Sequence, residues 1–264
     1  MTAKSKKIID GGAARPWLTM VHGMSHDHRV FSEQVSAFRE SYRILLVDLP
    51  GHGLSAGIPG PFGHQELADH VLAALDEANI SATHYWGTHT GTALGLLLAL
   101  RHPHRFFSLI LEGAVLPGRP MRSVMSGLRD VQDIAQNRSM DEARRFWFEN
   151  SAWFDVIRRR PAECRAEDHW AILSDFPGKP WVNPGRAAPL DIPDDELKML
   201  GKPLLLYNGE HDVADFIEAA DQLESLLPAA RRAVISEAGG FPAWEFPDRT
   251  NEVVERFLAH LEPD

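Results

Sequence analysis

The sequence predicts an α/β fold built on a mostly parallel, doubly wound sheet. Short β-rich runs alternate with helical segments along the chain, and these runs are continuously apolar. Continuous apolar runs are typical of strands that helices cover on both faces. The alternation breaks once, over residues 115–201, which carry helical patterning and few strand signals. An insertion of this size predicts a helical lid over the strand ends, where such sheets bind their ligands.

The individual elements follow from the same pattern. Strands are expected at residues 17–21, 42–48, 82–86, 107–112, 203–208 and 232–236. Helical periodicity predicts helices at residues 31–39, 64–78, 92–101, 216–226 and 250–261. We therefore expect a core formed by residues 1–114 and 202–264, with residues 115–201 as the lid insertion.

Composition and charge exclude several functions. Among 264 residues, 27 Lys and Arg face 37 Asp and Glu, and the net charge of −10 disfavours binding to nucleic acid. The single cysteine, Cys164, cannot form an internal disulfide bond or a multi-thiolate metal site. The first ten residues lack the apolar run of a signal peptide, and residues 93–100 are too short to cross a bilayer. We expect a cytoplasmic protein with a small-molecule substrate and no membrane partner, and the oligomeric state stays open.

A turn motif and four further motifs carry a family resemblance. At residues 86–91, Trp-Gly-Thr-His-Thr-Gly, a strand leads into a tight turn and then a helix. The other motifs are Val-His-Gly-Met at 21–24, Asp-Leu-Pro-Gly-His-Gly-Leu-Ser at 48–55, Gly-Glu-His-Asp at 209–212 and Gly-Gly-Phe-Pro-Ala-Trp-Glu-Phe-Pro at 239–247. With them the chain resembles the α/β-hydrolase family over nearly its whole length. Its first half is most similar to the enol-lactonase and C–C-bond hydrolase branch.

The chain departs from the family at two catalytic positions. The resemblance implies Ser, Asp or Cys at the elbow and His in the last loop, where this sequence has His89 and Gly240. Because acyl transfer by a serine hydrolase needs a hydroxyl group and a histidine base, that reaction is not available. The matching acid, Asp212, remains. We expect the His89 ring to fill the space vacated at Gly240 and to form a His–Asp dyad with Asp212.

Two carboxylates have second interpretations. Asp212 also fits the N-cap of the helix that follows it. Glu112, at the end of a predicted strand, is a reserve partner for His89, and capping explains it equally well.

The resemblance also implies a binding pocket. Its oxyanion hole would consist of the backbone N–H groups of Met24 and Thr90, which do not depend on side-chain identity. Ser25 and Thr88 are predicted to bind the substrate. The aromatic lid residues Trp147 and Trp153 are predicted to line a cavity for a small apolar or aromatic molecule.

Three functions stay open on this evidence. The first is a cofactor-free enzyme in which His89, oriented by Asp212, is a general base. The second is a catalytically silent protein that keeps the pocket for a small ligand. The third is a hydrolase in which His89 is the nucleophile and forms an acyl-imidazole. The segment Ser-His-Asp-His at 25–28 resembles a metal-binding sequence, but no matching ligand cluster accompanies it, so we expect neither metal nor cofactor.

Overall fold

One sheet with the strand order β1-β3-β2-β4-β5-β6-β7 organises the described chain. The computed structural model describes residues 6–9, 12, 14–183, 185, 187 and 190–261. The strands are β1 (Lys6–Ile9), β2 (Trp17–Val21), β3 (Arg43–Val47), β4 (Thr83–Thr88), β5 (Phe106–Glu112), β6 (Leu204–Gly209) and β7 (Arg231–Ile235). β1 runs antiparallel to β3, and all other neighbours are parallel. The predicted mostly parallel sheet is confirmed, and each predicted strand is present within two residues of its expected bounds.

The sequence pattern does not reveal β1. This strand has four residues, Lys-Lys-Ile-Ile, and pairs with β3 at the edge of the sheet. Only two of its residues are apolar, whereas the other edge strand, β7, has the three-residue apolar run Ala-Val-Ile. Its signal therefore lies below what periodicity can detect.

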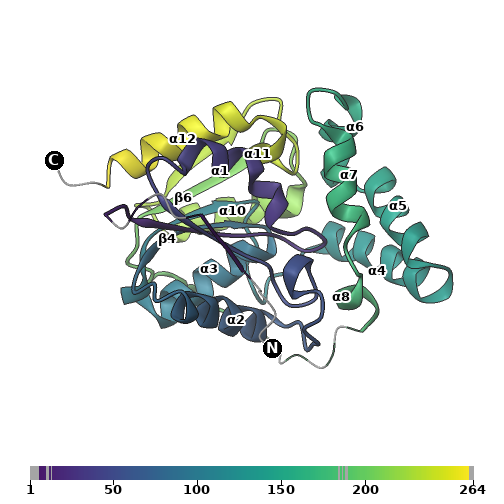
Figure 1. Ribbon diagram of the computed structural model, residues 1–264, viewed down its shortest axis with the longest axis horizontal. Helices are drawn as coiled ribbons and strands as arrows, with labels where there is room; N and C mark the ends of the chain where they lie inside the picture. Colours follow the sequence, from purple (N-terminus) through teal and green to yellow (C-terminus); the bar gives the residue numbers. More distant parts are fainter. Residues whose placement is uncertain are drawn as a thin grey trace.

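Helices cover both faces of the sheet (Figure 1). One face carries α1 (Ser32–Phe38), α11 (Pro242–Glu245) and α12 (Pro247–Ala259), and the other carries α2 (His64–Glu77) and α3 (Thr90–Arg101). Buried alanine and leucine side chains of α10 (Ala214–Leu226) pack in the same core as α2 and α3. None of the described helices has the length and apolar character needed to cross a bilayer.

A run of helices separates β5 from β6, and it includes no strand among the described residues. It contains α4 (Arg122–Asn137), α5 (Met140–Asn150), η4 (Ala152–Phe154), α6 (Asp155–Arg159), α7 (Ala166–Ser174), α8 (Lys179–Val182) and α9 (Asp194–Leu197). We call residues 122–197 the helical segment. Figure 1 shows α4 to α8 beside one end of the sheet.

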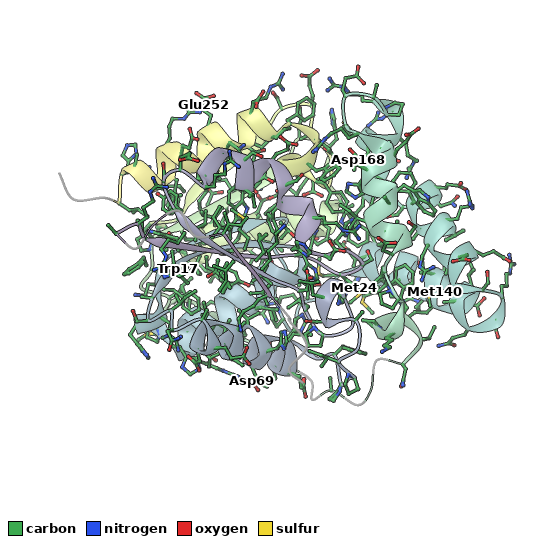
Figure 2. The ribbon with its side chains drawn as sticks, viewed as in Figure 1. Trp17, Met24, Asp69, Met140, Asp168 and Glu252 are labelled. Carbon is green, nitrogen blue, oxygen red and sulfur yellow. The ribbon has the colours of Figure 1, made fainter. Side chains whose placement is uncertain are left out.

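The strand register brings several loops to one place. Val21 is level with Val47 on β3 and with Gly87 on β4, and Thr88 is level with Glu112 on β5. The loops that follow these parallel strands therefore leave the sheet at the same edge. Met24, just after β2, lies on the side of the core that faces the helical segment (Figure 2).

Candidate active site

A strained turn places His89 at the centre of the site. β4 runs directly into α3, and His89 between them has φ 45° and ψ −112°, a conformation that residues with a side chain rarely adopt. A Cβ atom at Gly87 would lie 2.5 Å from the carbonyl oxygen of Gly91, and one at Gly91 would lie 2.3 Å from that of Val21. The turn thus requires both glycines, and it presents an imidazole where the family presents its nucleophile.

The imidazole of His89 is buried among aromatic rings. The ring centroids of Phe216, Phe241 and Trp153 lie 4.7, 5.1 and 6.0 Å from its own. Its Nε2 atom is buried and has no hydrogen-bond partner among the described residues. Burial lowers the pKa of His89 to about 3, with a further decrease from His26 and an opposing effect of the Gly240 backbone. At neutral pH this ring is therefore uncharged.

The expected hydrogen bond between His89 and Asp212 is not formed within the described structure. One carboxylate oxygen of Asp212 accepts a hydrogen bond from Asn208 at 2.7 Å, and the other accepts one from the backbone N–H of Val213 at 2.7 Å. Burial raises the pKa of Asp212 to about 7, although both hydrogen bonds oppose this rise. Asp212 secures the turn into α10, whose N-cap is Val213, one residue later than predicted.

Glu112, the reserve partner, is also engaged elsewhere. Its Oε2 atom accepts hydrogen bonds from the hydroxyl of Tyr207 at 2.6 Å and from the backbone N–H of Ala243 at 3.1 Å. The contact of Glu112 with the turn between β4 and α3 is made by its backbone carbonyl, which accepts a hydrogen bond from the N–H of His89 at 2.9 Å. Burial raises the pKa of Glu112 to about 8. Neither predicted acid therefore orients the imidazole in this structure.

A tryptophan, rather than His89, fills the space beside Gly240. A Cβ atom at Gly240 would lie 2.6 Å from Cδ1 of Trp153 and 2.9 Å from its carbonyl oxygen. The His89 ring lies over Gly113 instead, where a Cβ atom would come within 2.8 Å of Nε2. The expectation that one imidazole replaced the other is corrected: interiors are closely packed, and η4 of the helical segment supplies the filling side chain.

The two predicted oxyanion donors lie beside His89. Neither the N–H of Met24 nor that of Thr90 donates a hydrogen bond to a described acceptor, and both residues line the same cavity as His89. Gly23 allows the loop after β2 to lie close to His89, since a Cβ atom at residue 23 would lie 3.0 Å from the Cβ atom of His89. Ser25 follows with φ 66°, a second strained residue in the loop. Two free backbone donors next to a neutral imidazole suit an oxygen that gains negative charge.

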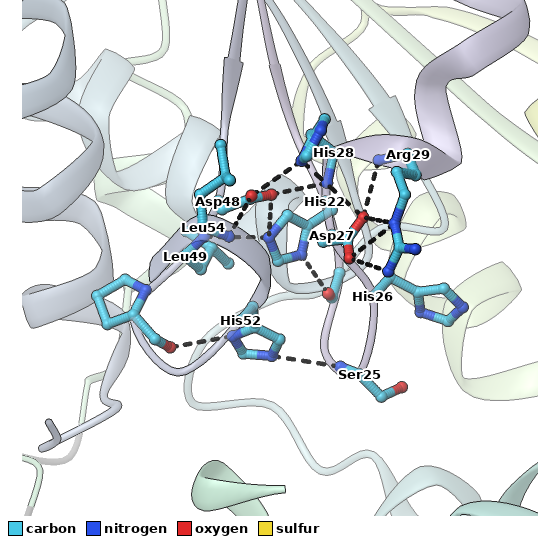
Figure 3. Close-up of polar contacts among 12 residues, drawn as sticks. His22, Ser25, His26, Asp27, His28, Arg29, Asp48, Leu49, His52 and Leu54 are labelled. Carbon is cyan, nitrogen blue, oxygen red and sulfur yellow. Dashed lines mark hydrogen bonds and ion pairs between the residues drawn. The ribbon is translucent and has the colours of Figure 1, made fainter. Parts of the chain in front are cut away.

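Two buried histidines anchor the loop after β2 (Figure 3). His22 donates through Nδ1 to the carbonyl of Gly23 at 2.7 Å and accepts the N–H of Leu49 through Nε2 at 3.0 Å. His52 accepts the N–H of Ser25 at 3.3 Å. Burial lowers the pKa of both histidines, that of His52 to about 3, so each ring is neutral and one of its nitrogens can accept a hydrogen bond. These rings hold the loop that carries the Met24 amide.

The segment that resembles a metal-binding sequence takes part in a network of its own. Asp48 accepts hydrogen bonds from the backbone N–H of His28 at 2.7 Å and from its Nδ1 at 2.9 Å. The guanidinium of Arg29 forms an ion pair with Asp27 at 2.7 Å. These contacts connect the loops after β2 and β3 (Figure 3). They also bring one possible ligand atom each of Asp27, His28 and Asp48 within 4.8 Å of one another, a cluster that was not expected from the sequence.

A cavity of about 240 Å³ opens above His89. Three of the four predicted substrate-binding residues line it, namely Ser25, Trp147 and Trp153. Thr88 is buried at the end of β4 and is not part of the described wall. The rest of the wall is formed by Met24, His26, His64, His89, Thr90, Val115, Leu116, Pro117, Gly118, Arg119, Met121, Val124, Met125, Leu128, Phe216 and Phe241. None of these described wall residues is Asp or Glu, so the cavity offers hydrogen-bond donors and apolar surface but no carboxylate.

The sequence did not point to several wall residues. Phe216 belongs to α10, and Phe241 follows Gly240 in the last loop. Each is apolar and periodic with the core, so only its position in space marks it as part of the site. His26 was noticed as a metal candidate, yet it contributes to the wall next to His89.

Comparisons with known proteins agree with this architecture. A 3-oxoadipate enol-lactonase of Acinetobacter baylyi is 23% identical over 262 residues, covering 96% of this chain and 92% of that protein. A 2-hydroxy-6-oxononadienedioate/2-hydroxy-6-oxononatrienedioate hydrolase of Paraburkholderia phymatum is 26% identical and covers 94% of this chain and 89% of that protein. The solved structure of an enol-lactonase from Burkholderia xenovorans matches with a TM-score of 0.79 at 23% identity, covering 96% of this chain and 95% of that one.

These relatives confirm the resemblance to the enol-lactonase and C–C hydrolase branch. Other relatives are named as esterases, and these names together indicate that this chain is a hydrolase-like enzyme. A family model described as the alpha/beta hydrolase fold matches residues 16–176, more than half of the chain. The protein therefore belongs to the α/β-hydrolase fold family.

Proposed function

We propose that this protein is a cofactor-free enzyme that acts on a small apolar or aromatic substrate, with His89 as its general base and an oxyanion hole at Met24 and Thr90. One observation carries the proposal: the imidazole and both unpaired amides line a single cavity of about 240 Å³. That volume suits a molecule with one ring or a short chain. This chain has His89 in place of the family's usual nucleophile, so proton transfer replaces acyl transfer as the central step.

Proton transfer to His89 is favourable only when the substrate itself supplies the negative charge that balances the imidazolium. The substrate O–H or activated C–H bond breaks, an N–H bond forms on His89, and the electron pair moves to a substrate oxygen at the two amides. The resulting imidazolium has no carboxylate in the described cavity wall as its partner. Its counterion is then the substrate's own anion, because burial lowers the pKa of His89 and leaves the resting ring neutral.

Two further features fit the same proposal. Residues 115–201 act as a lid, because Trp147 and Trp153 from the helical segment close the cavity over His89. Two relatives are named for an enol lactone and for a 2-hydroxy-6-oxo dienedioate. Substrates of these kinds pass readily into enols or enolates, which is the charge change that the two amides would stabilise. An enolisable ketone or enol lactone is therefore the proposed substrate class.

The test compares the wild type with His89→Gln on a panel of aryl enol lactones and aryl 1,3-diketones, followed by ultraviolet absorbance. Glutamine keeps hydrogen-bonding atoms but is no base, so we expect kcat/KM to fall by about 10²–10⁴. Tryptophan fluorescence should still report ligand binding by the variant. Turnover that survives in His89→Gln, or an acyl group trapped on a serine, would contradict the proposal.

Asp212→Asn is the matched variant. An amide at position 212 would face the Asn208 donor, so we expect a loss of roughly 1–3 kcal/mol in the free energy of unfolding. Because Asp212 does not contact His89, its kcat/KM should change less than about tenfold. A loss equal to that of His89→Gln would instead show that a His–Asp dyad forms during turnover.

A silent ligand-binding protein is the second candidate. It is favoured by Trp153, which occupies the space that the family gives to its catalytic histidine. This candidate predicts ligands that change the tryptophan fluorescence but are not converted anywhere in the panel. An acyl-imidazole trapped on His89 would assign the third function, in which histidine is the nucleophile.

A further inference from the structure

A buried histidine pair connects the helical segment to the loop after β2 that carries Met24, which we call the oxyanion loop. Nε2 of His26, in the loop after β2, lies 2.8 Å from Nε2 of His169 on α7. Both side chains are buried, and each ring centroid lies 4.9 Å from that of Phe241. The pair is thus enclosed between the core and the helical segment, beside the cavity that His26 lines.

The direction of this hydrogen bond is fixed by its neighbours. Nδ1 of His26 lies 3.0 Å from the carbonyl oxygen of Met24, which can only accept, so Nδ1 carries the hydrogen. Burial lowers the pKa of His26 to about 4, and the ring is neutral. Its Nε2 is then an acceptor, and His169 donates to it. The remaining nitrogen of His169, Nδ1, is buried without a described partner.

This chain of contacts ends at a residue of the oxyanion hole. The Met24 carbonyl accepts hydrogen bonds from His26 and from the hydroxyl of Ser25 at 2.6 Å. The Met24 carbonyl belongs to the Met24–Ser25 peptide, so holding it restrains the ψ torsion of Met24. The Met24 N–H lies in the preceding peptide, whose Gly23 carbonyl accepts a hydrogen bond from His22 at 2.7 Å. With that peptide held by His22, the contact from His26 limits how far the two peptides can turn relative to each other about the Met24 Cα. We propose that His169 is a positioning residue, which couples the placement of α7 to the direction of the Met24 amide. The proposal rests on the proposed function, because that function gives the Met24 amide its role.

Two other contacts between the helical segment and the core differ in kind from this pair. Arg165 forms an ion pair with Glu33 at 2.6 Å, and Arg29 forms one with Asp175 at 2.8 Å. These side chains are partly exposed, and neither pair contacts Met24. Exposed pairs contribute little to stability, so they hold the segment loosely. Only the His26–His169 pair, of these three contacts, reaches the oxyanion loop through buried atoms.

The experiment compares three variants in the full chain. His169→Phe keeps a ring but removes the donor, whereas His169→Gln keeps an N–H donor near the position of Nε2. Glu33→Gln removes the charge from an ion pair between the helical segment and the core away from the site. The probes are benzoate, whose oxygens need the oxyanion amides, and toluene, which has the same ring without them. Dissociation constants come from tryptophan fluorescence, and the Met24 amide resonance is followed by NMR without ligand.

We expect His169→Phe to weaken benzoate binding about tenfold, the effect of one lost charge-assisted hydrogen bond, and to shift the Met24 amide resonance. Toluene binding should change less than about twofold. His169→Gln should recover most of the benzoate affinity, and Glu33→Gln should resemble the wild type. With a substrate that is turned over, His169→Phe should lower kcat more than it raises KM.

Three results would overturn the inference. Equal losses for benzoate and toluene would mean general damage to the cavity, and an unchanged Met24 resonance would mean no coupling. Failure of His169→Gln to recover binding would exclude the hydrogen bond as the cause. A failure of the proposed function looks different: the wild type then turns nothing over, while the binding and NMR results still decide the role of His169. A wild type that binds toluene but not benzoate contradicts both.

Discussion

The two sides of His89 differ in what they are made of. On one side, Met24 and Thr90 present backbone N–H groups to the cavity, and no side chain is needed for that role. On the other side, the family's proton relay depends on side chains. Gly240 has none, and Asp212 is bonded to Asn208. A feature built from backbone persists through substitution, whereas one built from cooperating side chains is lost when a single member changes.

Trp153 packs against the position of Gly240. Its indole touches the place where a side chain at residue 240 would begin, and its own ring packs on Trp147 with centroids 4.7 Å apart. The helical segment has thus closed over the vacant position. Restoring a histidine at residue 240 requires a change in the segment as well as in the core.

The largest expected effect is the recovery of esterase activity by three changes together. His89→Ser with Gly240→His should remain inactive, because Trp153 leaves no room for the new ring. Adding Trp153→Ala removes the Cδ1 contact at 2.6 Å, while the carbonyl oxygen and Cα of residue 153 stay 2.9 and 3.1 Å from a Cβ atom at residue 240. With the indole gone we expect η4 to give way by a few tenths of an ångström, so that a serine triad forms against Asp212. We expect the triple variant to hydrolyse p-nitrophenyl acetate at least about 100-fold faster than the double variant.

The wild type and Trp153→Ala serve as controls for this assay. Both lack a hydroxyl nucleophile at the elbow, so neither should show a burst of nitrophenol. A double variant as active as the triple one would mean that Trp153 moves aside easily. The contrast between the two sides of His89 would then be weaker than the packing suggests.

A smaller effect is expected for stability at the same position. Gly240→Ala places a Cβ atom 2.6 Å from Trp153, an overpacking that should cost roughly 1–3 kcal/mol in the free energy of unfolding. In a Trp153→Ala background the Cδ1 contact is absent and the backbone contacts at 2.9 and 3.1 Å remain, so the same change should cost less. Urea unfolding of the four proteins gives the coupling energy, and additive losses would show that the two residues do not share a space.

Much of the fold could be predicted because its signals are local. The apolar runs of β2 to β7 and the glycines of the elbow each report a condition that the sequence must meet nearby. β1 escaped because an edge strand with lysines carries no such run. The same loop motifs pointed to Met24 and Thr90, which line the cavity with His89, and their role as oxyanion donors stays a prediction.

The polar partners of the site could not be predicted in this way. Whether Asp212 bonds to His89 or to Asn208 depends on a competition between neighbours in space. The residue that fills the space at Gly240 comes from η4, far along the chain, and packing alone selects it. His169 carries no motif at all, and only its 2.8 Å contact with His26 reveals it.

The smallest expected effect concerns the buried carboxyl groups on the side of His89 where the family has its proton relay, which we call the relay side. Burial raises the pKa of Glu112 and of Glu245 to about 8 and that of Asp212 to about 7. The folded protein therefore keeps protons that the unfolded chain releases near pH 4.5. Groups with raised pKa values stabilise the fold fully below their unfolded pKa, and this contribution is lost as the pH rises through the folded pKa. The oxyanion side has no such groups in its described wall, so only the relay side should lose stability above neutral pH.

Glu112→Gln isolates one of these groups. The glutamine oxygen can still accept from Tyr207 and Ala243, so the fold should be kept. Between pH 7 and 8.5 we expect the wild type to lose about 1 kcal/mol more than the variant, a difference of roughly 2–4 °C in Tm. This window lies above the range in which buried histidines such as His89 contribute, because their lowered pKa values cost stability only below about pH 6.5. Glu255→Gln, on the exposed face of α12, should follow the wild type. Parallel pH profiles for wild type and Glu112→Gln would mean that Glu112 is ionised at neutral pH, and the relay side would then hold a buried negative charge available to an imidazolium at His89.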